Sequence, residues 1–116
     1  MKNREEGRLG EDLAVEYLKK NGYRILERNY RYEHGEIDVI AGQNDTLVFV
    51  EVKARRTKGF GEPEDAITPK KQEQIRKTAE GYLFEHDIDD TDCRFDVIAI
   101  QYEKNQPKLR HIEDAF

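Results

Sequence analysis

Two acidic residues and a lysine stand on two successive apolar segments of the sequence. Asp38 lies in segment 35–41, and Glu51 and Lys53 lie two apart in segment 46–54. Carboxylate oxygens are ligands for Mg²⁺ and Mn²⁺, which leave further coordination positions to water and phosphate. A neighbouring lysine can stabilise charge that develops on phosphate oxygens. These residue types therefore indicate metal-assisted hydrolysis of a phosphodiester, with Asp38, Glu51 and Lys53 as the catalytic residues.

A hairpin between the two segments would decide whether the carboxylates meet. Residues 42–45 are Gly-Gln-Asn-Asp, which favours a tight reversal, and we expect Gln43 to face Thr46. This register places Asp38 opposite Glu51, with β-carbons about 5 Å apart. Two carboxylates at that distance repel by about 3 kcal/mol at an effective dielectric of about 20, and a divalent cation offsets the repulsion. A structural glutamate–lysine pair at a strand end is the alternative interpretation.

A third candidate ligand, Glu11, lies on an expected helix. On a helical wheel it falls at the margin of the apolar stripe and can face the sheet. Gly7 and Gly10 would let this helix approach the hairpin closely, although glycine destabilises a helix interior by about 1 kcal/mol. An exposed helix carboxylate remains the alternative.

Periodicity along the chain predicts the elements that hold these residues. The apolar run at residues 48–52 is typical of a strand covered on both faces, so Glu51 interrupts a buried element. Thr68 is expected to cap a helix whose first residue is Pro69. We predict one α/β domain, 1–116, with helices packed against a mixed central β-sheet of about five strands. The expected order is a helix (4–21), an edge strand (23–32), the hairpin, a loop (57–65), a helix (68–84) and two strands (94–102 and 109–112).

Composition narrows the class of protein. The chain has 20 lysines and arginines against 25 aspartates and glutamates, a net charge of −5, which argues against an overall basic coat for nucleic acid. Cys93 is the only cysteine, which excludes an intrachain disulfide and a cysteine-based zinc finger. No apolar stretch approaches the roughly 20 residues of a membrane span, and no signal-peptide core follows Met1. We expect a cytoplasmic protein without a membrane partner.

The remaining polar residues give weaker signals. His34, His86 and His111 are scattered without the spacing of metal ligands, which argues against a zinc site. Asp96 follows Arg94-Phe95 and is interpreted as part of an ion pair at the start of a strand. Four cations within residues 53–58 and further lysines at the start of the second helix form basic stretches, for which solvated faces are the alternative interpretation.

The sequence resembles the YraN-like family of small uncharacterised bacterial proteins over nearly its whole length. That family looks like a branch of the restriction-endonuclease-like nuclease superfamily, close to archaeal Holliday-junction resolvases. The superfamily signature is an aspartate followed by (Asp/Glu)-x-Lys on the neighbouring strand, and Asp38 and residues 51–53 match it. Glu11 matches the helical glutamate of the resolvases, while Ile37 stands where a proline often precedes the aspartate. The matching stretches are 7–14, 29–31, 35–40, 49–55, 60–61, 94–97 and 115–116.

The resemblance implies a metal-dependent endonuclease acting on DNA, including branched or Holliday-junction-like structures. Lys53 would orient the attacking water or stabilise phosphate charge. The resemblance also leaves open whether the protein is a homodimer, because a junction-cutting enzyme needs two sites. Two alternatives remain: a nuclease-fold nucleic-acid-binding protein without cleavage, and a structural or interaction protein. The implied ligands of Mg²⁺ (or Mn²⁺) are Glu11, Asp38, Glu51 and the carbonyl of Val52, and the implied nucleic-acid contacts are Arg55, Arg56, Lys70, Lys71 and Gln72.

Overall fold

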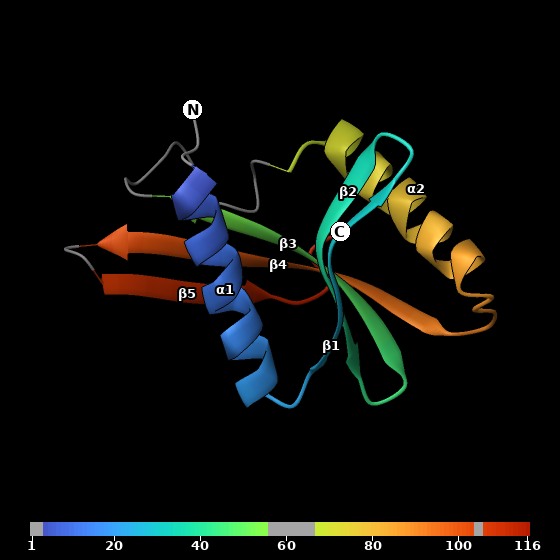
Figure 1. Ribbon diagram of the computed structural model, residues 1–116, viewed down its shortest axis with the longest axis horizontal. Helices are drawn as coiled ribbons and strands as arrows, with labels where there is room; N and C mark the ends of the chain where they lie inside the picture. The colour runs from blue at the N-terminus through green and yellow to red at the C-terminus, as the bar shows by residue number, and fades with distance from the viewer. Residues whose placement is uncertain (1–3, 56–66, 104–105) are drawn as a thin grey trace.

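The computed structural model describes residues 4–55, 67–103 and 106–116 (Figure 1). Within these ranges the helices and strands expected from periodicity are present, with β4 and β5 each starting two or three residues earlier than expected. The expected loop at 57–65 lies outside the described residues. The elements are α1 (Arg4–Lys20), β1 (Arg24–Tyr32), β2 (Gly35–Gln43), β3 (Thr46–Arg55), α2 (Pro69–Glu85), β4 (Asp92–Glu103) and β5 (Gln106–Ile112).

The strands form one mixed sheet in the order β1-β2-β3-β4-β5. β3 and β4 run parallel, and the other neighbouring pairs are antiparallel. A parallel pair needs a crossover connection, and α2 lies in the segment between β3 and β4. β3 is the middle strand, which explains its apolar run, and β1 is an edge strand as predicted. The hairpin register is confirmed, because Gln43 pairs with Thr46 and Val39 with Val50.

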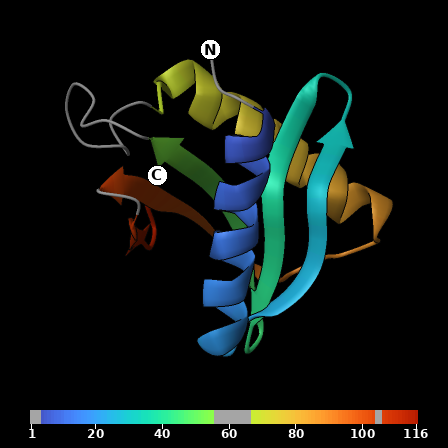
Figure 2. The ribbon, with the colours of Figure 1, turned by 60° about the vertical axis from the view of Figure 1, so that its left-hand side comes forward.

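The two helices cover opposite faces of the sheet, with α1 in front of the strands and α2 behind them in Figure 2. Each helix buries an apolar stripe against the sheet. The α1-side core consists of Ala14, Val15, Leu18, Tyr23, Val39, Ala41, Val48, Val50, Val52, Ile98 and Ile100. The α2-side core consists of Tyr30, Ile37, Ile40, Leu47, Phe49, Ile75, Ala79 and Tyr82. These two layers of helix on a mixed sheet are consistent with a nuclease-like α/β fold.

Two local features place the helices relative to β3. A β-carbon added to Gly10 would lie only 2.8 Å from the β-carbon of Ala54, so glycine lets α1 approach the end of β3 as the sequence predicted. Thr68 caps α2, since its side chain accepts a hydrogen bond from the Lys71 N–H, and Pro69 follows in the first turn. Both predictions for this helix start are confirmed.

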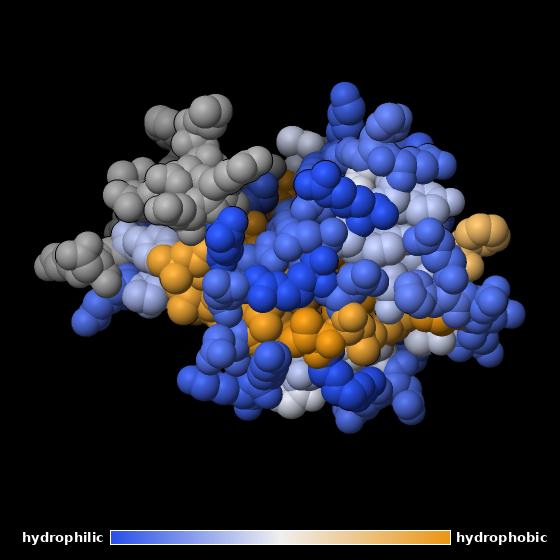
Figure 3. Space-filling view, viewed as in Figure 1, coloured by the Kyte–Doolittle hydropathy of each residue, from blue (hydrophilic) through white to orange (hydrophobic). Residues whose placement is uncertain are grey.

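One face of the molecule is mainly polar. Figure 3 shows hydrophilic side chains over much of one face, with a strip of apolar side chains across its middle. Of the helices in the described part of the chain, none combines the length and the apolar character that crossing a membrane requires.

Candidate metal centre

Asp38 lies where the regular pairing of β2 is interrupted. Pairing of β2 with β3 stops at Val39, one pair before the expected pair of Asp38 and Glu51. Residues two apart in a regular strand share a face, yet Ile37 packs in the α2-side core and Val39 in the α1-side core. The Asp38 Oδ2 accepts a hydrogen bond of 2.8 Å from the backbone N–H of Val52. The Asp38 carboxylate therefore lies at β3, beside the peptide that follows Glu51.

Glu51 carries a carboxylate into the face of the sheet that α2 covers. Its neighbours Val50 and Val52 belong to the α1-side core, so strand alternation turns Glu51 toward α2. The Lys71 Nζ on α2 lies 3.7 Å from Glu51 Oε2. Glu51 is only 9% exposed, and Oε2 is a buried oxygen without a hydrogen-bond partner among the described residues. An orphaned buried carboxylate oxygen is unfavourable unless a cation or donor satisfies it.

Glu11 faces the sheet as predicted, but β1 holds its carboxylate. Arg28 Nε at 3.0 Å and Asn29 Nδ2 at 2.8 Å both donate to the same oxygen, Glu11 Oε1. Asn29 has a φ of 53°, in the left-handed region where asparagine is enriched, and it falls at the β1 position across from Asp38. Arg28 also pairs with Asp12 at 2.6 Å. Glu11 is thus linked through Asn29 to the strand position opposite Asp38.

The three carboxylates do not form a ready-made cluster. Across residues 4–55, 67–103 and 106–116, no three aspartate, glutamate, histidine or cysteine side chains lie close enough to hold a metal ion. Asp38 and Glu51 adjoin the Val52 peptide, whereas Glu11 is bonded to β1. Lys53 is half-buried and, two residues after Glu51, shares its face of β3. The structure thus places Asp38 and Glu51 beside one peptide of β3, with Lys53 two residues further along that strand.

The residues implied to contact nucleic acid differ in their surroundings. Lys70 is exposed on the first turn of α2, while Lys71 pairs with Glu51. Gln72 Nε2 donates to the Ile67 carbonyl at 3.1 Å, so its amide supports the start of α2. Arg55 is half-buried at the end of β3. Arg56 lies outside the described residues.

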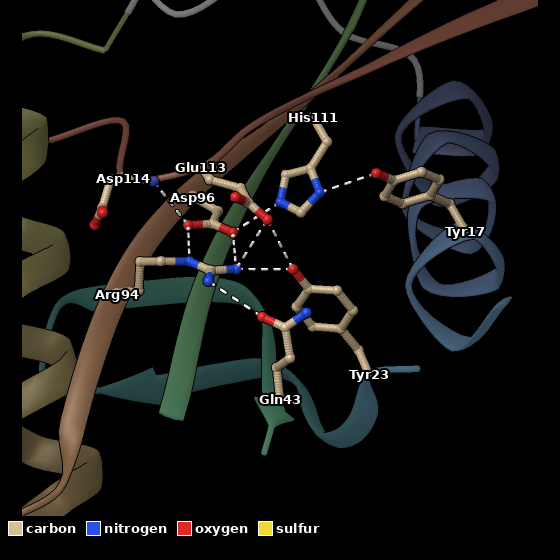
Figure 4. Close-up of polar contacts among 8 residues, drawn as sticks. All are labelled: Tyr17, Tyr23, Gln43, Arg94, Asp96, His111, Glu113 and Asp114. Carbon is tan, nitrogen blue, oxygen red and sulfur yellow. Dashed lines mark hydrogen bonds and ion pairs between the residues drawn. The ribbon is translucent and has the colours of Figure 1, made fainter. Parts of the chain in front are cut away.

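A second polar cluster, which sequence reasoning found only in part, surrounds Asp96 (Figure 4). Asp96 is fully buried, and Arg94 donates to both of its oxygens at 2.9 Å. His111 Nε2 lies 2.7 Å from Oδ2, and the Asp114 N–H donates to Oδ1 at 3.1 Å. The other His111 nitrogen, Nδ1, contacts the Tyr17 hydroxyl at 3.0 Å. The predicted ion pair of Arg94 and Asp96 is confirmed.

The groups around Asp96 favour its charged form. Burial alone raises its pKa, but hydrogen bonds from His111 and Arg94, with that from the Asp114 N–H, outweigh burial and hold the pKa below its ordinary value. Arg94 correspondingly has a raised pKa, chiefly through its hydrogen bonds to Asp96. An ionised Asp96 accepts hydrogen bonds only, so His111 Nε2 carries the proton. Alternation along β4 puts Asp96 on the α1 face, away from the face of Glu51.

Replacing Asp38 with alanine is expected to destabilise the protein in metal-free buffer by about 1–3 kcal/mol, because the partly buried Val52 N–H loses its acceptor. Urea unfolding measures the change. Glu36→Ala is the matched control on the same strand. Among the described residues, Glu36 makes a surface ion pair of 3.7 Å with Arg31, and the effect of the substitution should stay below about 1 kcal/mol. Equal losses of unfolding free energy in the two variants would mean that the Asp38 hydrogen bond stabilises the protein no more than the surface ion pair of Glu36 does.

Comparison with known proteins gives one consistent family. The model of the uncharacterised protein family UPF0102 matches residues 10–100. A UPF0102 protein of Alkaliphilus oremlandii is 51% identical over 116 residues, covering 98% of this chain and 99% of the relative. A UPF0102 protein of Chlorobium phaeobacteroides is 49% identical, covering 92% of this chain and 89% of its own length. One of Geobacter sulfurreducens is 50% identical, covering 92% and 84%.

Proposed function

The chain belongs to the uncharacterised protein family UPF0102, and from that premise we propose that it is a metal-dependent endonuclease that hydrolyses phosphodiester bonds in DNA. The observation that carries the proposal is the buried Glu51 Oε2, which has no hydrogen-bond partner among the described residues. An Asp38 carboxylate one peptide away and Lys53 on the same strand face support it. DNA as partner and a homodimer with two sites belong to the same proposal.

The residues present fit a hard divalent cation. Every ligand in the proposed set is an oxygen, which suits Mg²⁺ or Mn²⁺. Asp38, Glu51 and the carbonyl of Val52 would hold the ion, with Glu11 as a further ligand. Because Arg28 and Asn29 both bind Oε1 of Glu11, its other oxygen is the one proposed for the metal. When bound, Mg²⁺ or Mn²⁺ would polarise the scissile phosphate and lower the pKa of a water molecule.

The chain's own cations would position the substrate. Lys53 would orient the attacking water or stabilise charge on the phosphate oxygens. Lys70 and Arg55 would contact flanking phosphates, which fixes DNA without reading its sequence. Arg56, Lys71 and Gln72 complete the proposed contacts, Arg56 on the sequence alone.

The test is incubation of the purified protein with Mn²⁺ and a panel of branched and linear DNA, with Glu51→Gln beside it. The proposal expects cleavage of at least one substrate by the intact protein and none by the variant. Calorimetry with Mn²⁺ separates the alternatives. Metal binding without cleavage of any DNA would favour a binding module, and the absence of metal binding would favour a structural or interaction protein.

Replacing Lys53 with methionine is expected to lower cleavage about 100- to 1000-fold, the usual effect of losing one group that stabilises transition-state charge. Its Mn²⁺ affinity should stay within about 2-fold, since an ammonium is not a metal ligand and, within the described part of the chain, Lys71 rather than Lys53 forms the ion pair with Glu51. Single-turnover cleavage and calorimetry measure the two quantities. Lys19→Met, at an exposed position of α1, is the control for loss of one positive charge. Similar rates in all three proteins would remove Lys53 from the mechanism.

A further inference from the structure

The contact between Lys71 and Glu51 is an ion pair without a hydrogen bond. Lys71 Nζ lies 3.7 Å from Glu51 Oε2, beyond hydrogen-bonding distance. Oε2 is nevertheless buried and accepts no hydrogen bond from any described group. Lys71 thus offsets the charge of Glu51 but does not satisfy Oε2 as a hydrogen-bond donor.

The first turn of α2 fixes where Lys71 begins. Thr68 Oγ1 accepts the Lys71 N–H at 3.1 Å, and Gln72 ties the same turn to the carbonyl of buried Ile67. No acidic residue occupies this turn, although it carries both Lys70 and Lys71. Lysines at the positive end of a helix dipole are unfavourable. A nearby anion offsets this, and Glu51 supplies one.

A divalent cation on Glu51 would disturb this pair. Mg²⁺ binds oxygen at about 2.1 Å, so a cation on Oε2 would lie within a few ångströms of Nζ and repel it. The Lys71 side chain is 36% exposed, whereas that of Glu51 is 10% exposed. Lys71 is therefore the partner that can move out to solvent, because its flexible stem reaches the surface.

We propose that Lys71 is an exchangeable counter-ion of the candidate metal centre. It neutralises Glu51 in the metal-free protein, leaves when a divalent cation binds, and then contacts a substrate phosphate. This inference rests on the proposed function and deepens it, since it couples metal loading to the grip on DNA. Binding free energies are reciprocal, so a phosphate that engages Lys71 also favours metal binding.

Titration calorimetry with Mn²⁺ alone, without DNA, tests the exchange in the full chain. Lys71→Gln removes the competing charge and should raise Mn²⁺ affinity by about 5-fold or more. Lys70→Gln is the matched control: the neighbouring lysine undergoes the same change of charge but lies exposed on α2. Lys71→Arg keeps a cation there. Both should stay within about 2-fold of the original affinity.

Thermal unfolding supplies a second readout that needs no cleavage. Lys71→Gln should lower the midpoint in metal-free buffer, because Glu51 loses its counter-ion, and Mn²⁺ should raise the midpoint of this variant more than that of the unaltered protein. Equal or weaker Mn²⁺ binding by Lys71→Gln would overturn the exchange while leaving the proposed function intact. No Mn²⁺ binding by any of the proteins would overturn the proposed metal centre and the exchange together.

Discussion

Replacing Glu51 with glutamine is expected to abolish most DNA cleavage, with a loss of at least about 1000-fold in the single-turnover rate with Mn²⁺. The neutral amide has nearly the shape of the carboxylate but no negative charge to hold a divalent cation. Calorimetry should show Mn²⁺ affinity falling together with the rate. The effect is large because Glu51 offers a buried oxygen without a hydrogen-bond partner among the described residues.

Unfolding does not account for such a loss of cleavage. Glu51→Gln removes a buried charge that accepts no hydrogen bond through Oε2 from residues 4–55, 67–103 or 106–116. It leaves Lys71, whose side chain is 36% exposed, able to reach water. We therefore expect its unfolding free energy in metal-free buffer to change by less than about 1 kcal/mol. Glu73→Gln is the control, since Glu73 is paired at the surface with Lys77, at 3.7 Å, within the part of the chain that the structure describes. Retained cleavage by Glu51→Gln would mean that the metal centre lies elsewhere in the protein.

The register of the hairpin was predictable because side-chain periodicity and turn chemistry agree. A slip of one residue would turn the apolar side chains of β3 to the wrong faces, and the pair Gln43 and Thr46 is found where the turn residues put it. The start of α2 was predictable for a similar local reason. Thr68 and Pro69 determine that start within a few residues of sequence.

The end of the regular β2–β3 pairing next to Asp38 was not predictable from the hairpin sequence. It coincides with Asn29 on β1, whose left-handed backbone the hairpin sequence does not encode. Loss of Asp38 is therefore expected to destabilise the metal-free fold, because its carboxylate accepts the Val52 N–H.

Contacts between distant segments were also beyond the sequence. The pair of Lys71 and Glu51 depends on how α2 packs on β3, which periodicity does not specify. In the cluster around Asp96, His111 lies 15 positions from Asp96 along the sequence, and Tyr17 lies 94 positions from His111. Only the spacing of Arg94 and Asp96, two apart on one strand, gave a local signal.

Replacing Asp96 with asparagine is expected to destabilise the protein by about 3–5 kcal/mol at neutral pH, the usual effect of breaking a buried ion pair from one side. Asp96 is fully buried and accepts hydrogen bonds from Arg94, His111 and the Asp114 N–H. The asparagine side chain keeps one oxygen that accepts hydrogen bonds. Its NH₂ group, which is a donor, faces other donors at the position of the second carboxylate oxygen. Urea unfolding at neutral pH measures the loss. Asp92→Asn, an exposed position on the same strand, should change stability by less than about 0.5 kcal/mol.

The loss in Asp96→Asn should also shrink in acid, and the sign follows from the pKa. The folded-state pKa of Asp96 lies below its ordinary value, because hydrogen bonds from His111 and Arg94 outweigh the opposing effect of burial. The charged form therefore contributes stability that is present above the unfolded pKa of about 3.9 and is lost as pH falls through the folded pKa. Below about pH 4 the unaltered protein should approach the variant. A difference in unfolding free energy that stays constant from neutral pH down to acid would mean that the Asp96 charge does not stabilise the fold, leaving side-chain packing as the source of the loss.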